Sequence, residues 1–251
     1  MMAGIRRGNG KELRRILRNS DMKAGFSAYQ VSRDNMKAVT RSEPTILAQV
    51  PAWFYVLAGA VLVSLQVAIL HGFGQPFFAA SGRILLWVGN PSSPETSQQL
   101  ADWYSFSHII HGFIFFGLLR LVAPRLPLAA RFLIAMGIEI GWEIAENTPA
   151  VIQHYRKQAL AAGYVGDSIL NSVSDTFMMS SGFFFASRVR ARIVIALAVA
   201  LEVFTACAIR DNLTLNVLNL IAPAQWAPIQ AIHDWQADAI PGRAGANAAQ
   251  P

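Results

Sequence analysis

Charged residues and cysteines are scarce in this chain. Asp, Glu, Lys and Arg make up 14% of its 251 residues, and the only cysteine is Cys207. One cysteine excludes an internal disulfide framework, and so little charge is atypical of a soluble domain. The glycine-rich phosphate loop and the Gly-x-Ser-x-Gly and His-Glu-x-x-His signatures are also missing. The common nucleotide-binding, α/β-hydrolase and zincin motifs therefore give no indication of function.

Hydrophobic residues, by contrast, make up 53% of the chain and gather in five long runs. The first, AWFYVLAGAVLVSLQVAIL, has no charge and is long enough to cross about 30 Å of hydrocarbon as a helix. It is longer than a secretory core of about 7–15 residues, so we interpret it as a span and not as a cleaved signal peptide. We expect membrane spans at about 52–71, 105–122, 129–147, 168–187 and 191–209.

The net charge of +6 is explained by where the basic residues lie, and it does not indicate a nucleic-acid partner. Sixteen of the 21 Lys and Arg residues lie before the first expected span, or in and directly beside the links between the second and third and between the fourth and fifth. Basic residues favour the cytoplasmic side of a membrane. The sequence therefore predicts an all-α integral membrane protein, a bundle of five transmembrane helices with the N-terminus cytoplasmic and the C-terminus extracytoplasmic. We expect it in the cell inner membrane as a multi-pass protein.

Three regions follow from this topology. Residues 1–47 would form a basic, disordered cytoplasmic tail, and residues 48–210 would form the membrane domain. Residues 211–251 would form an extracytoplasmic interfacial segment and a flexible tail, because APAQWAPIQAIHDW carries a short amphipathic stripe suited to the headgroup boundary. Membrane lipids are the partners that this pattern predicts, and it names no protein partner.

Polar residues occur mainly near one end of each expected span after the first. If the spans alternate in direction, DWYSFSHIIHG, EIAEN, GDSILNSVSDT and RDN all lie at the outer side. At about 100° per residue, Glu139, Glu143 and Glu146 share one face of the third span, and His108 and His111 are neighbours on the second. A charged side chain near the bilayer centre costs roughly 2.5–3.5 kcal/mol, so we expect these groups to turn inward.

Imidazole together with carboxylate is a ligand set for Zn, Fe or Mn. These groups suit a divalent metal, with His108, His111, Glu143 and Asp175 as candidate ligands and Glu143, Glu146 and Asp175 as candidate catalytic carboxylates, while the cofactor itself stays unknown. A bound cation would relieve the excess of acids over bases at this side. Protonation of the buried acids would relieve it as well, and that alternative stays open.

Simpler roles also fit several of these residues. Two histidines three residues apart can serve as interhelical hydrogen-bond partners. Glu146, just before Pro149, fits the polar end of a helix, and Asp167-Ser168 suits the N-cap of the fourth span. Glu202 stands alone in the fifth span and could pair with an Arg or His across the bundle.

The strings DWYSFSHIIHGF, EIGWEIAENTPAVIQHYR and GDSILNSVSDT resemble a family of bacterial inner-membrane proteins of unknown function, over about Ala48 to Trp235. The resemblance implies a multi-pass membrane protein with no assigned activity, and it does not extend over the basic tail. The order of histidines, a Glu-rich helix and an Asp/Asn-rich helix is also similar, more loosely, to VanZ-like small membrane proteins. Neither resemblance carries over a catalytic residue.

Two classes of function fit this pattern. In the first, a metal in the outer pocket activates water to hydrolyse a lipid headgroup or cell-envelope precursor. In the second, the pocket is not enzymatic and holds a cation or relays protons, or the polar network only fixes helix packing in an accessory protein. Permeation would need a polar path to the cytoplasmic side, and the inner halves of spans two to four are nearly uncharged. This weakly favours the first class over a transporter.

Overall fold

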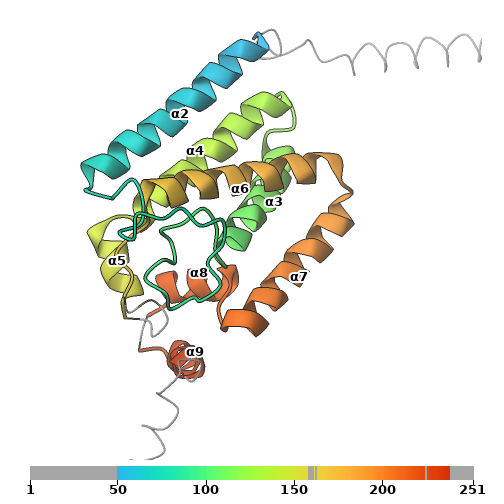
Figure 1. The fold of residues 1–251 in the computed structure, drawn as a ribbon. Coiled ribbons are helices and arrows are strands. Elements are labelled where there is room, and N and C mark those ends of the chain that lie inside the picture. Colours follow the sequence, from blue (N-terminus) through green and yellow to red (C-terminus); the bar gives the residue numbers. More distant parts are fainter. Residues whose placement is uncertain (1–49, 158–160, 162, 224, 238–251) are drawn as a thin grey trace, which may run out of the picture. The chain divides into compact units, whose positions relative to one another are not determined.

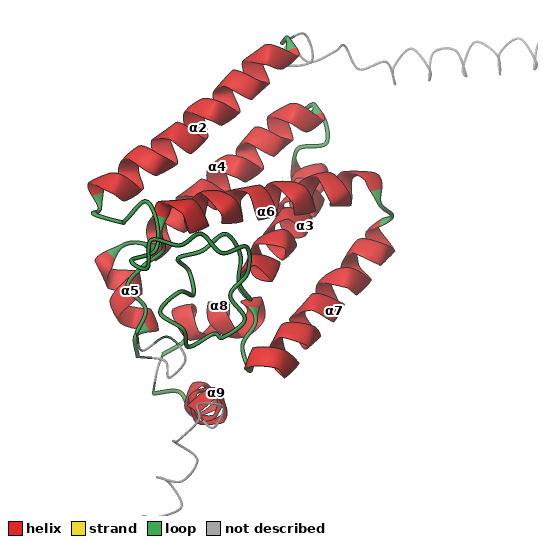
Figure 2. Ribbon diagram, in the orientation of Figure 1, coloured by secondary structure: helices red, strands yellow, loops and turns green. Residues whose placement is uncertain are grey.

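The computed structural model describes residues 50–157, 161, 163–223 and 225–237. These residues form helices joined by loops, and no strand is found among them (Figure 1 and Figure 2). The helices are α2 (Ala52–Gly72), α3 (Ser105–Val122), α4 (Leu128–Glu146), α5 (Pro149–Tyr155), α6 (Ile169–Arg188), α7 (Ala191–Ile209), α8 (Leu213–Ile221) and α9 (Ala227–Ala237). The expected all-α class is confirmed, whereas the expected tail over 1–47 lies outside the described residues.

The helices α2, α3, α4, α6 and α7 begin and end within one residue of the expected spans. Three described helices, α2, α3 and α7, are long and apolar enough to cross a membrane by length and composition. Both α4 and α6 carry more polar side chains, and the acids among these turn inward, since Glu139, Glu143 and Asp175 are buried. The structure thus supports a protein with membrane-spanning helices, while crossing by all five stays a prediction.

The bundle has a central group and two flanks. The central pair, α3 and α6, packs most closely, and α4 lies against both. On opposite sides of this group, α2 packs against α4 and α7 packs against α3 (Figure 1). The outward faces of the flanking helices are apolar, with Val56 of α2 exposed by 72% and Ile195 of α7 by 64%. Such faces suit hydrocarbon, where apolar side chains have no cause to be covered.

Two glycines bring α3 and α6 together. A Cβ atom placed on Gly112 of α3 would lie 2.1 Å from the main-chain oxygen of Met179, and one on Gly182 of α6 would lie 2.2 Å from that of Ile109. Both positions therefore exclude a side chain, as is typical where membrane helices approach backbone to backbone. This close approach sets the separation of the helices that carry His108 and Asp175.

One end of the central group is filled by apolar side chains. Its core includes Phe116 of α3, Met136 of α4, and Met179 and Phe183 of α6. The ring of Phe183 is fully buried and lies 5.4 Å from that of Phe116, edge to face. Because α3 and α6 end here and α4 begins here, this is the end that the charge distribution predicts to be cytoplasmic.

The loop over residues 73–104 organises the opposite end, where α6 begins (Figure 2). The first main-chain N–H groups of a helix lack partners within it. Here Ser168 N–H donates to the Ser97 carbonyl at 2.9 Å, and Ile169 N–H donates to the Pro76 carbonyl at 2.8 Å. The hydroxyl of Ser168 accepts from Asn171 N–H at 3.1 Å. Of the two residues expected at this N-cap, Ser168 is the cap and Asp167 is not.

Glu202 has a different partner from the one expected. Its carboxylate accepts from the main-chain N–H groups of Leu213 and Thr214, both at 3.1 Å, and from the Thr214 hydroxyl at 2.5 Å. Within the described residues it has no ion pair with an Arg or His, so that expectation is wrong. The main-chain amides of α8 compensate the charge because a helix N-terminus is a favourable place for an anion.

Candidate functional site

The carboxylate of Glu139 lies between the two histidines. Nδ1 of His108 lies 2.6 Å from Glu139 Oε1, and Nδ1 of His111 lies 3.0 Å from Glu139 Oε2. All three side chains are buried. A carboxylate accepts, so Nδ1 is the donor in both rings, and Nε2 is the ring nitrogen that a metal ion could bind. This is how a carboxylate orients metal-binding histidines in proteins.

Glu143 lies one turn along α4 from Glu139. Its Oε2 accepts from the Ser172 hydroxyl at 2.6 Å. Its Oε1 receives no hydrogen bond, although it lies 3.3 Å from His108 Nδ1, and the residue is 1% exposed. A buried carboxylate oxygen without a donor is costly, and a cation would satisfy it.

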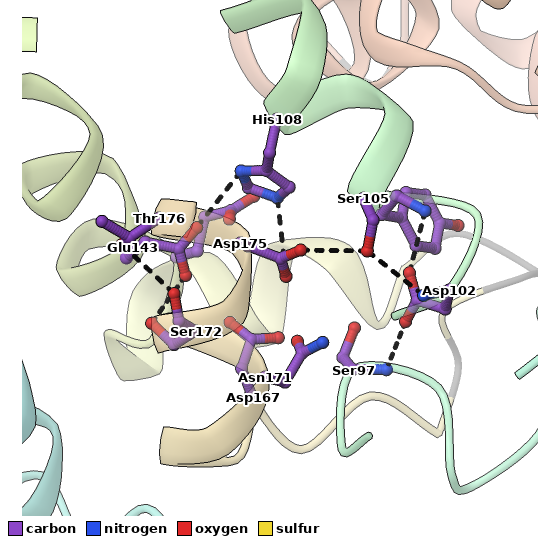
Figure 3. A network of polar contacts seen from close by, with 12 residues as sticks. Ser97, Asp102, Ser105, His108, Glu143, Asp167, Asn171, Ser172, Asp175 and Thr176 are labelled. Carbon is purple, nitrogen blue, oxygen red and sulfur yellow. Dashed lines mark hydrogen bonds and ion pairs between the residues drawn. The ribbon is translucent and has the colours of Figure 1, made fainter. Parts of the chain in front are cut away.

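Asp175 faces the same histidine from α6 (Figure 3). Its Oδ2 lies 3.9 Å from His108 Nε2, and its Oδ1 accepts from the Ser105 hydroxyl at 3.0 Å. The Asp175 side chain is buried. His108 therefore meets acids from both directions, with Glu139 and Glu143 at Nδ1 and Asp175 at Nε2.

The polar network extends to α2 through Gln66, a fully buried residue in an otherwise apolar run. Its Nε2 donates to the Ser172 hydroxyl at 2.9 Å, and its Oε1 accepts from Thr176 Oγ1 at 3.1 Å. Gln66 therefore supports the serine that holds Glu143. Sequence reasoning missed it, although one amide within a nineteen-residue apolar stretch was the available signal.

In the part of the chain that the structure describes, two groups of His, Asp or Glu side chains place ligand atoms within 4.8 Å of one another: His108 with His111 and Glu139, and His108 with Glu143 and Glu146. Four of these five residues were expected in the site, and Glu139 was expected on the same face but not as a site residue. Asp175 belongs to neither group, although it contacts His108. His108 belongs to both groups, so it is the candidate ligand that lies close to the largest number of the others.

A cavity of about 210 Å³ opens beside this network. All of the predicted site residues line it: His108, His111, Glu143, Glu146 and Asp175. The loop over residues 91–97 and the start of α8 complete its wall. The expected site residues thus come from three helices to one cavity, which is what the alternating direction of the spans predicted.

Three tyrosines form a repeated pattern around the cavity, because each donates its hydroxyl to a carboxylate. The pairs are Tyr104 with Asp211 at 3.1 Å, Tyr155 with Glu146 at 2.8 Å, and Tyr164 with Asp167 at 2.9 Å. All six residues line the cavity. Sequence reasoning found the acids and missed the tyrosines, since these lie in loops or a short helix that hydrophobic periodicity does not describe.

Two of the lining acids that lie outside the expected spans are set to titrate near neutral pH. Burial raises the pKa of Asp211 to about 7, against the lowering effect of hydrogen bonds from Asn212 N–H and Tyr104. Burial also raises the pKa of Asp167 to about 6, although Tyr164 and Asn147 donate to it. Both carboxyl groups can therefore change charge within the physiological range.

Comparison with known proteins gives a family but no activity. The family model described as "Protein of unknown function (DUF2585)" matches residues 70–238. A UPF0314 protein of Sphingopyxis alaskensis is 52% identical over 181 residues, which cover 72% of this chain and 94% of that protein. One from Rhizobium etli is 49% identical over 185 residues, covering 74% and 92%, and one from Novosphingobium aromaticivorans is 45% identical over 175 residues, covering 68% and 86%.

No solved structure matches this chain. The looser likeness to VanZ-like proteins is not supported by these matches, whereas the resemblance to a bacterial family of unknown function is confirmed. The matched region contains the entire polar network except Gln66 of α2. The chain belongs to the DUF2585 family of unknown function.

Proposed function

We propose that the protein crosses the inner membrane with five helices and that its cavity is a metal-dependent hydrolytic site for a lipid headgroup or cell-envelope precursor. The observation that carries this proposal is that the Glu139 carboxylate contacts Nδ1 of both His108 and His111. These contacts leave Nε2 of each ring available to a divalent cation. The unsatisfied oxygen of Glu143 and the contact of Asp175 with His108 supply the carboxylate part of such a ligand set.

The chemistry follows from these groups. A divalent cation held by His108, His111 and Glu143 would supply a water that loses its proton near neutral pH. Glu146, half-buried in the cavity wall, would accept the proton that this water loses. The hydroxide would attack the phosphorus or carbonyl carbon of the substrate, and the bond to the leaving group would break as Glu146 returns the proton to it.

The five-span arrangement is favoured by the side on which polar groups lie. Every acid on α4 and α6 faces the cavity or the helix interface, and the outer faces of α2 and α7 are apolar. Acids that face lipid would cost roughly 2.5–3.5 kcal/mol each on insertion scales, whereas acids that face one another and water avoid this cost. The cavity then opens toward the outer leaflet, where lipid headgroups lie.

Permeation is disfavoured by the apolar end of the bundle. Phe116, Met136 and Phe183 fill the space between the central helices beyond the polar network. These apolar side chains offer no ligand atom or proton carrier that would continue a path from the cavity. A hydrolytic site needs access from one side only, so this closure costs it nothing.

Metal analysis of the purified protein tests the proposal. After mild dialysis in detergent, the wild-type protein should retain a stoichiometric divalent metal, and His108→Ala should lose it. His71→Ala is the matched control, because His71 is exposed and does not line the cavity. Absence of metal from the wild-type protein would overturn the proposal.

The same preparations separate an enzyme from a cation-binding protein. Vesicles of phosphatidylethanolamine and phosphatidylglycerol provide the substrate probe, and released headgroup or phosphate is measured. Release by the wild-type protein and by His71→Ala, but not by His108→Ala, is the expected result. A metal that is bound without any release would refute the hydrolytic function and favour the non-enzymatic cation site.

A further inference from the structure

The wall of the cavity differs chemically from its floor. The floor holds the two histidines with Glu143 and Asp175, whereas the wall carries the three tyrosine–carboxylate pairs. None of the described residues that line the cavity is a Lys or Arg. Arg156 is exposed and donates to the main-chain carbonyl of Tyr164, not to an acid. The cavity therefore has a negative wall without a fixed positive charge to balance it.

Such a wall has a chemical preference. Carboxylates beside aromatic rings are the groups that proteins use to hold organic ammonium ions, through charge and through the cation–π interaction. Each tyrosine hydroxyl already donates to one carboxylate oxygen. In two of the pairs the second oxygen also accepts, Asp211 Oδ1 from Asn212 N–H and Gln236, and Asp167 Oδ2 from Asn147. A carboxylate offers about four lone pairs, so an ammonium group would donate to those that remain. A bare phosphate or sulfate would be repelled by the same acids.

A second observation points to a positively charged ligand. Glu143 lines the cavity at its floor, and its Oε1 is buried and receives no hydrogen bond. If a metal satisfies Glu143, it supplies positive charge at the floor that can take the phosphate of a headgroup, while the wall takes a cation. A ligand with an anionic and a cationic group is therefore complementary to both parts of the cavity.

We propose that the cavity recognises a headgroup bearing both phosphate and a primary ammonium, with the ammonium held by Asp211 and Asp167 beside Tyr104 and Tyr164. This names the substrate class for the proposed function and rests on it for the phosphate end. A cavity of about 210 Å³ holds several water molecules, which suits a small headgroup and leaves acyl chains outside. The ligand could be a lipid headgroup or the free phosphoamine, because both present the same chemistry.

Binding to the full-length protein in detergent tests the ammonium subsite. The probes are phosphoethanolamine and glycerol phosphate, which differ in the ammonium group, and affinity is measured by calorimetry. Phosphoethanolamine should bind at least about tenfold more tightly, the scale of one charge-assisted hydrogen bond. Equal affinities for the two probes, or binding of neither, would overturn the proposal.

Substitutions locate the subsite. Asp211→Asn and Asp167→Asn should each reduce the preference for phosphoethanolamine about tenfold, with thermal unfolding confirming that the variants are folded. Asp234→Asn is the control, because Asp234 is an exposed acid that does not line the cavity. A loss of preference in Asp234→Asn as large as in the cavity variants would refute the location and indicate a general charge effect.

Metal content and competition by lipid nanodiscs distinguish the failure of this proposal from the failure of the proposed hydrolytic function. Asp211→Asn should retain its metal, since Asp211 lies outside the histidine groups, so a lost preference with unchanged metal supports the subsite alone. A wild-type protein that prefers the ammonium probe without holding metal would refute hydrolysis and keep the amine site. Competition by phosphatidylethanolamine nanodiscs, but not phosphatidylglycerol nanodiscs, would identify the lipid as the source.

Discussion

The two ends of the α3–α4–α6 group are built from the same helices but by different physical means. At one end Phe116, Met136 and Phe183 interlock as apolar side chains. At the other end, His108 and Glu143 belong to a buried hydrogen-bonded network beside a cavity. The apolar end is stable when its side chains fill the available volume. The polar end is stable only when each buried hydrogen-bond donor has an acceptor.

This difference separates stability from function. Replacing a buried charged network by apolar residues of similar volume is often neutral or stabilising in proteins. The polar end also leaves Glu143 Oε1 without a hydrogen bond, which an end built only for stability would avoid. We therefore infer that the apolar end provides most of the stability of the fold and that the polar end binds a ligand. Substitutions at the two ends can test this division of roles.

The largest effect is expected from Phe183→Ala at the apolar end. Phe183 is fully buried between Phe116 and Phe132, and its loss should lower the free energy of unfolding by about 3–5 kcal/mol. Thermal unfolding in detergent measures this. Phe177→Ala on the same helix is the control, since Phe177 is 59% exposed and should matter by less than about 1 kcal/mol. Similar losses in both variants would contradict the assignment.

A smaller effect is expected from Gly112→Ala, at the close contact between α3 and α6 that both ends of the group depend on. Gly112→Ala introduces a Cβ atom 2.1 Å from the Met179 carbonyl, so α3 and α6 must move apart at a cost of about 1–3 kcal/mol. Because the movement also shifts His108, bound metal should fall together with thermal stability. Gly117→Ala is matched to it on the same helix, with nothing within 4 Å of its new Cβ, and should leave both measurements unchanged. Unchanged stability of Gly112→Ala would mean that the glycine contact does not set the helix separation.

A third effect is a dependence of stability on pH at the polar end. Burial raises the pKa of Asp211 to about 7, so the folded protein binds this proton more tightly than the unfolded chain, where the carboxyl has a pKa of about 3.9. Raising the pH from about 4 to 7 should therefore lower the free energy of unfolding, by up to about 1.4 kcal/mol per unit of pKa difference. A fall in the unfolding temperature with a chelator present measures this.

Asp211→Asn should flatten this dependence because the amide does not titrate, while Asp167 retains its own contribution. Asp234→Asn, at an exposed position outside the cavity, should follow the wild-type curve. If Asp211→Asn loses stability with rising pH as steeply as the wild-type protein, another group is responsible.

The five long helices, α2, α3, α4, α6 and α7, could be predicted almost to the residue, because the length and hydropathy of a helix are read from consecutive positions of the sequence. The gathering of His108, Glu143 and Asp175 was also predictable, since it follows from helix periodicity and the alternating direction of the spans. Both successes use only local pattern and topology.

The rest depends on contacts between distant segments. Glu139 lies on the expected face, but only the rotation of α3 against α4 decides that it, and not Glu143, contacts both histidines. The tyrosines lie outside the long helices, where no periodicity constrains them. The partner of Glu202 was mispredicted because main-chain amides of a later helix are invisible to a search for oppositely charged side chains.

That pairing has a consequence for biogenesis. During synthesis α7 leaves the ribosome before the amides of Leu213 and Thr214, which follow Glu202 by eleven and twelve residues. Until they arrive, a span with Glu202 exposed to hydrocarbon carries a penalty of roughly 2.5–3.5 kcal/mol near the bilayer centre. The high mean hydropathy of α7, 2.2, offsets this penalty. In the proposed five-span arrangement, α7 and α8 are therefore best inserted as one unit, so a chain truncated between them should be retained poorly in the membrane.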